Sequence, residues 1–480
     1  MTQLPKSFAD TQVCIIGLGY VGLTLSIIMA ESGFKVSGIE INDEVLDSIY
    51  QGRPHFFEPG LAERLDSVIK NERLTCSKRI SEGHAATVYI ITVGTPLNAD
   101  KVVNLDMIRS VAEQIATNLR ANDIVIMRST VKLGTTRDTV RPLLEKANVP
   151  FDLAFCPERT VEGNALNELR QLPQIVGGIT LESAVRAGQI FQFITPTVIR
   201  VSDVETAEFI KMVDNTYRDI TLAYSNEIAR IADAIGISAI EVVNAGTRGY
   251  KRVHLAVPGP VGGPCLEKDP HILAQSLAPY GIVPEIAMAA RTVNERQPEE
   301  VVQYLSGQVR QTPNMPDKPI IALLGIAFKG VPETDDLRGT MAKPIFKTIK
   351  TQFPEAEYRG YDPVVSSQQI RNFGLKPFDT LTDTLRNANL VLILNNHRKF
   401  GDMVLENVSN ILGKPCLVYD FWNNFLAGEL NLPEGVGYMA LGSHKKSLKP
   451  YRYKNEKICS NGRHRVYWIS GGQDAPERWA

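Results

Sequence analysis

The chain has 480 residues, 44% of them hydrophobic and 22% charged, so it is long enough to bury two or three separate cores. Its formal net charge of −1 offers no excess of positive charge for a nucleic-acid backbone or an anionic membrane. We therefore expect no nucleic-acid partner. No window approaches the ~18 apolar residues of a membrane span, and the N-terminus MTQLPKSFAD resembles no targeting segment, so we expect a cytoplasmic protein without a membrane span.

The first part of the chain reads as an α/β domain. Residues 12–41 run as a β-rich strand, a glycine turn, an apolar helix and a second strand, which together form one βαβ unit. Short apolar runs at 88–93 and 123–130 follow, separated by stretches with helical spacing. This alternation predicts a parallel, doubly wound, Rossmann-like sheet for residues 1–202.

The pattern changes at Asp203, where apolar residues follow helical spacing with no Gly or Pro until Gly236. This spacing predicts one long helix within a central helical domain at 203–310. A Pro-rich linker follows, and strand-like IIALLGIAF then begins a second Rossmann-like domain at 318–440. The long helix has more apolar surface than one thin domain can cover, so we expect a homodimer or a higher homo-oligomer. Residues 441–480 are expected to be an irregular tail.

A glycine motif lies between the first strand and the first helix. Gly17, Gly19 and Gly22 have the spacing GxGxxG, and Glu40 ends the next strand 21 residues after Gly19. Such glycines allow a sharp turn and the close approach of a pyrophosphate, while an acid at the second strand bonds ribose hydroxyls and disfavours a 2′-phosphate. The motif predicts NAD, although a glycine turn selected only for packing is the alternative.

The six cysteines are scattered without CxxC pairs, so we expect neither a metal site nor a disulfide framework. A free cysteine is more often an inert buried thiol than a nucleophile. Cys265, however, lies in GPVGGPCLEKDP, whose glycines and prolines predict an accessible loop, and Lys268 nearby would favour its thiolate. Lys211 and Asn215 are four residues apart on the long helix and therefore project from one face.

Eight short motifs are spaced along most of the chain. They are GLGYVG at 17–22, VGTP at 93–96, ST at 129–130, CPERTVEG at 156–163, EFIKMVDN at 208–215, NE at 226–227, VGGPCLEKD at 261–269 and GIAFKGVPETDDLR at 325–338. In these motifs and their order, over roughly residues 10–430, the chain resembles the nucleotide-sugar 6-dehydrogenase family, which includes UDP-glucose, GDP-mannose and UDP-N-acetylhexosamine enzymes.

The resemblance implies a four-electron oxidation of a sugar's 6-hydroxymethyl group to a carboxylate with two NAD+. Cys265 would form a thiohemiacetal and then a thioester, and Lys211 and Asn215 would stabilise the oxyanion. Glu158 would assist hydrolysis as a general base, with Thr130 and Asp269 holding a water. The implied substrate contacts are Glu158, Arg159, Glu162, Lys211, Asn215, Arg252, Gly262 and Lys329. The implied NAD contacts are Gly17, Gly19, Tyr20, Val21, Gly22, Glu40, Thr95, Thr130 and Arg338.

The choice of sugar rests on finer features. Arg159 replaces the aromatic residue usual in the UDP-glucose and GDP-mannose branches, and PGPVGG with Arg252 resembles the N-acetylhexosamine branch, in which a basic residue of this loop can reach a neighbouring subunit. Pro264 and the Lys268–Asp269 pair point the other way, and Trp422 stands where many relatives have a substrate-binding Arg. We favour UDP-GlcNAc, UDP-GalNAc or UDP-ManNAc and a role in surface polysaccharide biosynthesis.

Several alternatives stay open. UDP-glucose is the second choice of substrate, and a sugar-nucleotide sensor without catalysis is a different class of function. A one-step dehydrogenase of the hydroxyacid or 6-phosphogluconate type would need neither an exposed Cys265 nor a second α/β unit after residue 318. A scaffold protein would gain no thermal stability from NAD or UDP-sugars, because only ligands that bind the native state raise its stability.

Overall fold

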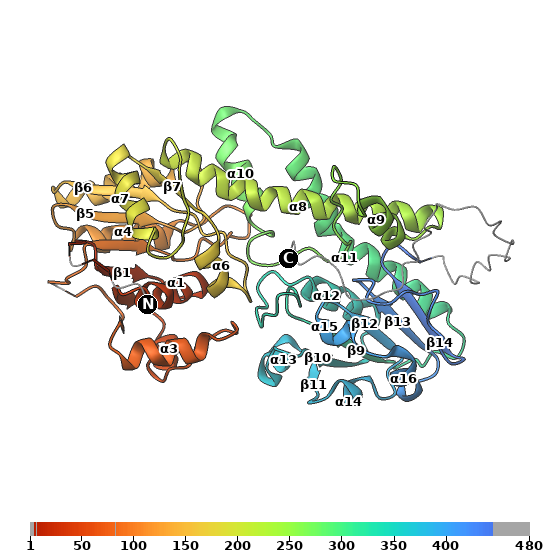
Figure 1. Ribbon diagram of the computed structural model, residues 1–480. Coiled ribbons are helices and arrows are strands. Elements are labelled where there is room, and N and C mark those ends of the chain that lie inside the picture. The colour runs from red at the N-terminus through yellow and green to blue at the C-terminus, as the bar shows by residue number, and fades with distance from the viewer. Residues whose placement is uncertain (1–3, 6, 82, 445–480) are drawn as a thin grey trace, which may run out of the picture.

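The computed structural model describes residues 4, 5, 7–81 and 83–444. Two α/β domains are joined by long helices (Figure 1). The N-terminal domain, coloured red to yellow, lies at one end of the molecule, and the C-terminal domain, coloured blue, lies at the other. Helix α8 starts beside the N-terminal sheet and runs on to the C-terminal domain.

The described residues of the N-terminal domain form an eight-stranded sheet in the order β3-β2-β1-β4-β5-β6-β7-β8. Strands β1 to β6 are parallel and have the order of a dinucleotide-binding fold. The strands are β1 (Gln12–Ile16), β2 (Lys35–Ile39), β3 (Leu74–Ser77), β4 (Val88–Ile91), β5 (Asp123–Met127), β6 (Phe151–Phe155), β7 (Gln174–Gly178) and β8 (Val198–Arg200). The predicted parallel sheet is thus confirmed through β6 and is wrong at β7, which pairs antiparallel with β6.

Helices cover both faces of this sheet, which is why every residue of β4 and β5 is buried. The helices of the domain are α1 (Tyr20–Glu31), α2 (Asp43–Tyr50), α3 (Leu61–Lys70), α4 (Asp106–Ala116), α5 (Arg141–Leu144), α6 (Ala165–Gln171) and α7 (Leu181–Phe191). Helices α1, α3, α6 and α7 contribute to one apolar cluster, and α4 and α5 contribute to the other.

The C-terminal domain repeats this architecture with a six-stranded parallel sheet in the order β11-β10-β9-β12-β13-β14. Its strands are β9 (Ile320–Leu324), β10 (Glu357–Tyr361), β11 (Lys376–Pro377), β12 (Leu390–Ile393), β13 (Cys416–Asp420) and β14 (Val436–Ala440). Its helices are α12 (Ala342–Gln352), α13 (Ser367–Phe373), α14 (Leu381–Leu385), α15 (Arg398–Gly401) and α16 (Leu405–Val408). The matching strand order confirms the predicted second Rossmann-like domain.

The central region consists of α8 (Val204–Ile235), α9 (Ala239–Thr247), α10 (Asp269–Leu277) and α11 (Glu285–Gln311). Helix α8 begins at Asp203, whose side chain accepts a hydrogen bond from Thr206 N at 2.7 Å, and ends at Gly236, which has φ of +79°. The predicted long helix is therefore confirmed. Because α8 contributes to the apolar cores of both end domains, it fixes their relative position.

One face of α8 is apolar, and no described segment of the chain covers it. Exposed apolar side chains recur along it at intervals of four or seven residues, namely Phe209, Val213, Tyr217, Tyr224, Ile231 and Ile235. On the helical wheel this stripe lies opposite Lys211 and Asn215. No described helix is long and apolar enough to cross a membrane.

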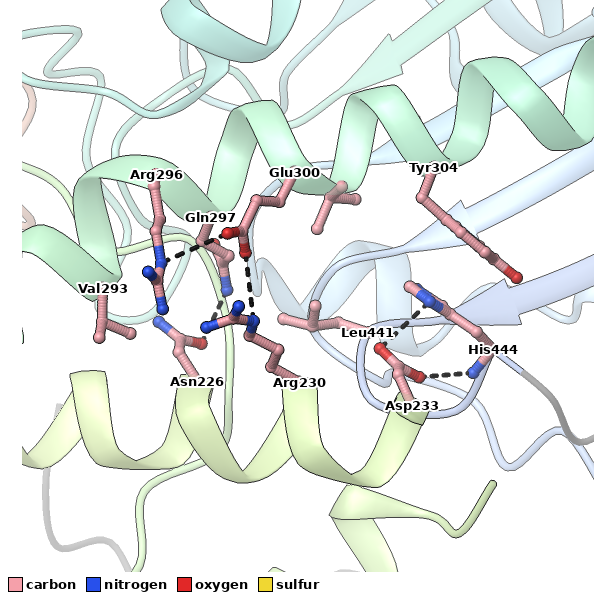
Figure 2. Close-up of a pocket in the computed structure, with 11 residues that line it drawn as sticks. Asn226, Arg230, Asp233, Val293, Arg296, Gln297, Glu300, Tyr304, Leu441 and His444 are labelled. Carbon is pink, nitrogen blue, oxygen red and sulfur yellow. Dashed lines mark hydrogen bonds and ion pairs between the residues drawn. The ribbon is translucent and has the colours of Figure 1, made fainter. Parts of the chain in front are cut away.

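A cavity of about 160 Å³ lies between α8, α11 and the chain after β14 (Figure 2). Its walls include Asn226 and Gln297, and an ion pair joins Asp233 to His444 across 3.1 Å at its far end. His444 is the last described residue, so most of the predicted tail lies outside the described residues. None of the lining residues belongs to the candidate site described below.

Candidate active site

The glycine turn after β1 contains three glycines, and each position favours glycine for a different structural reason. Gly17 has φ of +93°, which favours glycine. A Cβ on Gly22 would lie 1.8 Å from the carbonyl oxygen of Gly17, so helix and strand could not approach as they do. A Cβ on Gly19 would meet no atom within 4 Å. Gly19 therefore faces open space at the N-terminus of α1, where a pyrophosphate can approach the backbone.

Glu40 follows β2 beside this turn. Its Oε2 accepts a hydrogen bond from Leu18 N at 3.0 Å, and its Oε1 accepts from Ile41 N at 2.8 Å and Asn42 N at 3.0 Å. These bonds hold the carboxylate at the strand end where an acid binds the ribose of NAD. The turn also lies where the strand order reverses between β1 and β4, which is the usual nucleotide site of such sheets. The residues present thus fit NAD.

Cys265 lies in the loop of residues 259–268 that precedes α10, called here the Cys265 loop. The side chain is only partly exposed. Burial raises the pKa of the thiol above its ordinary value, and the Lys211 ammonium only partly opposes this rise. Lys268 instead donates hydrogen bonds to Thr95 Oγ1 at 3.1 Å and to the Thr95 carbonyl at 3.3 Å. The Lys268 charge also lowers this pKa, in the direction expected from the sequence, but burial has the larger effect and keeps the pKa of the thiol above its ordinary value.

Two helices bring polar groups to this loop. Asn215 on α8 donates a hydrogen bond from Nδ2 to Asp269 Oδ2 at 2.6 Å, and Asp269 N, at the start of α10, donates to the Cys265 carbonyl at 2.9 Å. Asp269 is fully buried, and its Oδ1 has no hydrogen-bond partner among the described residues. Lys211 is 7% exposed, and no described residue accepts a hydrogen bond from its Nζ. The site thus offers the Lys211 ammonium and the second hydrogen of Asn215 Nδ2 as donors, and Asp269 Oδ1 as an acceptor, to a substrate or a water.

Glu158 is held more firmly than its sequence motif indicates. Arg128 donates from Nε at 3.0 Å and from Nη2 at 2.6 Å to Oε2, while Arg159 N and Thr160 N each donate to Oε1 at 2.8 Å. Although burial raises the pKa of this carboxyl, the Arg128 guanidinium and the Thr160 amide hold it below its usual range. Both oxygens are therefore occupied in this geometry. Sequence analysis missed Arg128, because a single arginine after an apolar strand forms no motif.

Thr130 lies at the same end of the sheet. Its carbonyl accepts a hydrogen bond from Thr95 Oγ1 at 2.6 Å, and Thr95 in turn contacts Lys268. These contacts join the N-terminal sheet to the Cys265 loop. Tyr20 and Val21 are in the first turn of α1, beside the glycine turn.

The C-terminal domain meets the N-terminal domain at the end of β9. Lys329 donates from Nζ to the Glu162 carbonyl at 2.5 Å, and Arg338 forms ion pairs with Glu162 at 3.3 Å and Asp336 at 2.6 Å. Burial lowers the pKa of Lys329 to about 8, while burial and the Asp336 charge raise the pKa of Glu162. Lys329 follows β9 at the point where the second strand order reverses, so a second nucleotide site is expected to face the first.

Some predicted residues lie apart from this cluster. The Arg252 guanidinium stacks over the Tyr250 ring at 5.6 Å. Among the described residues, it forms no hydrogen bond or ion pair with the site. Arg159 pairs with Asp214 at 3.2 Å. Gly262 packs so closely that a Cβ would lie 2.1 Å from the Gly339 carbonyl oxygen. The Trp422 ring would lie 2.9 Å from a Cβ on Gly259, at the start of the Cys265 loop.

The fold and site define a dinucleotide-dependent dehydrogenase that has a second nucleotide-binding domain and a thiol near the contact between the two domains. The chain belongs to the UDP-glucose/GDP-mannose dehydrogenase family, and matches its NAD binding domain at 11–195, its central domain at 205–296 and its UDP binding domain at 322–426. The resemblance read from the sequence is thereby confirmed. The protein is an NAD-dependent nucleotide-sugar dehydrogenase.

Two relatives and one solved structure illustrate the similarity. A UDP-N-acetyl-D-mannosamine dehydrogenase of Pyrococcus horikoshii is 31% identical over 85% of this chain and 94% of its own length. An NDP-N-acetyl-D-galactosaminuronic acid dehydrogenase of Ralstonia solanacearum is 30% identical over 83% of this chain and 93% of its own. The structure of the UDP-D-ManNAc dehydrogenase from Pyrococcus horikoshii, 29% identical, covers 91% of this chain and all of its own with a TM-score of 0.80.

Proposed function

We propose that the protein oxidises the 6-hydroxymethyl group of a UDP-N-acetylhexosamine to the carboxylate of the uronic acid. The relatives above, named for N-acetylated sugars, support this branch over UDP-glucose. The observation that carries the two-step chemistry is the gathering of Lys211, Asn215 and Asp269 around Cys265. NAD+ held by the glycine turn and Glu40 would supply the hydride acceptor for the two oxidations.

The thiol accounts for the second oxidation. Cys265 Sγ bonds to C6 of the aldehyde, and the thiol proton ends on the former carbonyl oxygen to give a thiohemiacetal. Loss of a hydride and of that proton leaves a thioester, and water then releases the carboxylate and restores the thiol. Lys211 Nζ and Asn215 Nδ2 are the donors that stabilise the negative oxygen in these steps. Because the resting thiol has a raised pKa, its proton must leave as the carbon–sulfur bond forms.

The hydrolytic water needs an acceptor, and the hydrogen-bond pattern favours Asp269 over Glu158. Its Oδ1 is buried and has no hydrogen-bond partner in the part of the chain that the structure describes, whereas both oxygens of Glu158 already accept two hydrogen bonds each. We propose that Asp269 and Thr130 hold the water. Glu158 would then act as a general base only if its contacts with Arg128 loosen. In the same proposal Lys329 binds the substrate diphosphate, and Glu162 and Arg338 complete the cleft.

The test is NADH production with UDP-GlcNAc, UDP-GalNAc, UDP-ManNAc and UDP-glucose, measured for the wild type, Cys265→Ser and the control Cys76→Ser. We expect two NADH per sugar with one N-acetylated substrate, loss of the carboxylate product in Cys265→Ser, and no loss in the control. Preference for UDP-glucose would overturn the branch alone. Binding of NAD and UDP without NADH from any sugar would favour the sensor.

We further propose that two copies pair through the apolar stripe of α8, because six large apolar side chains on one helix face need a cover. Arg252, which has no contact with the site in its own chain, would then be available to the partner's cleft. The domain boundaries at 202/203, 310/318 and 440/441, a cytoplasmic location and a role in surface polysaccharide biosynthesis belong to the same proposal. Free thiols at the five described cysteines fit a reducing compartment.

A further inference from the structure

A buried arginine connects the two ends of the segment that carries Cys265. Arg291 on α11 is 1% exposed and is the largest fully buried side chain of the described residues. Its Nη1 donates to the Leu266 carbonyl at 2.8 Å, and its Nη2 donates to the Val261 carbonyl at 3.3 Å. Leu266 directly follows Cys265, and Val261 precedes it by four residues. One planar guanidinium thus spans the Cys265 loop, which a single ammonium could not do.

The arginine is itself fixed by α8. Nη1 also donates to Asp219 Oδ1 at 2.7 Å, and Asp219 is fully buried. Asp219 lies four residues after Asn215 and eight after Lys211, so it is on the helix that carries the proposed oxyanion donors. The ion pair therefore sets the distance between the Cys265 loop and those donors. Asn294 supports it with hydrogen bonds from Nδ2 to Asp219 Oδ1 at 2.9 Å and to the Asp219 carbonyl at 3.1 Å.

A second set of contacts holds the start of the loop. Asn226 on α8 donates to the Gly259 carbonyl at 3.0 Å and accepts from Gly259 N at 2.9 Å. Gln297 on α11 donates to Asn226 Oδ1 at 2.7 Å, and Figure 2 shows these two side chains meeting between the helices. Asn294 Oδ1 accepts from Asn226 Nδ2 at 3.0 Å and so links this set to Asp219. Residues 253–262, which lead into and begin this loop, adopt no regular secondary structure.

Stability alone is a weak explanation for a fully buried ion pair, because the cost of desolvating two charges offsets most of their attraction and apolar replacements are often neutral. Asp219 Oδ2 even lacks a hydrogen-bond partner among the described residues. The pair does, however, supply charged donors to carbonyls of an irregular loop whose position matters to a fraction of an ångström. This combination indicates a positioning role.

We propose that the Asp219–Arg291 pair is the positioning element that holds Cys265 Sγ at bonding distance from the sugar aldehyde. The proposal rests on the proposed function of Cys265. The first hydride transfer needs the glycine turn and the sugar but not the sulfur, whereas the second oxidation needs the carbon–sulfur bond. Loosening the loop should therefore slow the second step selectively. A misplacement near 1 Å costs about 100-fold in rate.

The test compares Arg291→Lys and Asp219→Asn with Arg230→Lys. Arg230 on α8 and Glu300 on α11 form a 3.8 Å ion pair between the same two helices without touching the loop (Figure 2). We measure kcat, KM, the number of NADH per sugar, the trapped aldehyde, NADH affinity and Tm. In the first two variants we expect kcat to fall about 10- to 100-fold, aldehyde to accumulate and NADH per sugar to drop from two towards one. NADH affinity should stay unchanged, and the control should behave as the wild type.

If the Asp219–Arg291 pair only stabilised the fold, the result would differ. Loss of folded enzyme would lower the rates of both oxidations equally and would keep two NADH per sugar. That outcome, or unchanged kinetics in a folded variant, would overturn the proposal. Asp219→Asn keeps the shape and an acceptor oxygen, so it provides the test if Arg291→Lys does not fold. If Cys265→Ser still yields two NADH per sugar and the carboxylate, the proposed function of Cys265 fails instead, which separates the two proposals.

Discussion

The glycine turn allows folding and NAD binding to be separated by substitutions three residues apart. Gly19 has φ of −66° and ψ of −165°, which alanine can adopt, and an added Cβ meets no protein atom within 4 Å. Gly19→Ala should therefore change the free energy of unfolding by no more than about 1 kcal/mol, since such replacements mainly restrict the unfolded chain. Gly22→Ala puts a Cβ 1.8 Å from the Gly17 carbonyl oxygen and must displace backbone.

We expect Gly19→Ala to weaken NADH binding and Gly22→Ala to lower the stability of the fold. In Gly19→Ala the new methyl occupies the approach of the pyrophosphate and removes one charge-assisted backbone hydrogen bond, worth about 1.5–3 kcal/mol. This loss corresponds to a roughly 10- to 100-fold higher Kd for NADH. Gly22→Ala should cost about 3 kcal/mol of stability or more, because overpacking against backbone cannot relax through a side chain. Its Tm should fall by about 6–12 °C.

The assay is a fluorescence titration with NADH beside a thermal unfolding scan of each variant. Gly428→Ala is the control, because a Cβ there also meets nothing within 4 Å and the residue lies far from the turn in sequence. The reasoning is refuted if Gly19→Ala binds NADH as tightly as the wild type, or if Gly22→Ala folds with an unchanged Tm.

Three further predictions concern the cleft and the assembly. Asp269→Asn should slow thioester hydrolysis about 100-fold or more, so that a covalent adduct on Cys265 is visible by intact mass, because Asp269 Oδ1, which no described residue contacts by a hydrogen bond, is the proposed acceptor for the water. Burial lowers the pKa of Lys329 to about 8, so UDP affinity should fall as the pH rises through about 8 and the ammonium loses its proton. Lys329→Met should abolish this pH dependence. A wild-type UDP affinity that stays constant through this range contradicts the prediction. Tyr224→Asp with Ile231→Asp should give a monomer in light scattering, because it places charge on the proposed dimer stripe; an unchanged mass would exclude that interface.

Much of the fold could be predicted because the hydrophobic pattern is local. Buried parallel strands read as short apolar runs, and α8 reads as 32 residues without a helix breaker between Asp203 and Gly236. The direction of β7 could not be predicted, because its pairing with β6 depends on how the chain returns to the sheet rather than on the residues of either strand. The domain boundaries stay predictions.

The individual site residues were also accessible to sequence reasoning. Gly17 and Glu40 are recognisable from their spacing along the first βαβ unit, and Cys265 from its glycine-rich surroundings. Lys211 and Asn215 became candidates only through the family resemblance, because a lysine beside a polar residue on one helix face is more often a solvated pair. Their roles in catalysis remain proposals, but the structure brings Lys211 and Asn215 to the Cys265 loop as their common helix face predicts.

What the sequence determined by itself is the class of fold, the NAD turn and the motif residues, because each depends on neighbours within one element. Only the tertiary structure decided the pKa values and the charged partners of the site residues. Cys265 has a raised rather than a lowered thiol pKa because burial exceeds the effect of nearby lysines. Arg291 meets Asp219 across 72 residues of chain. The interactions of a buried charge depend on the partner that folding brings next to it, and no local sequence pattern predicts that partner.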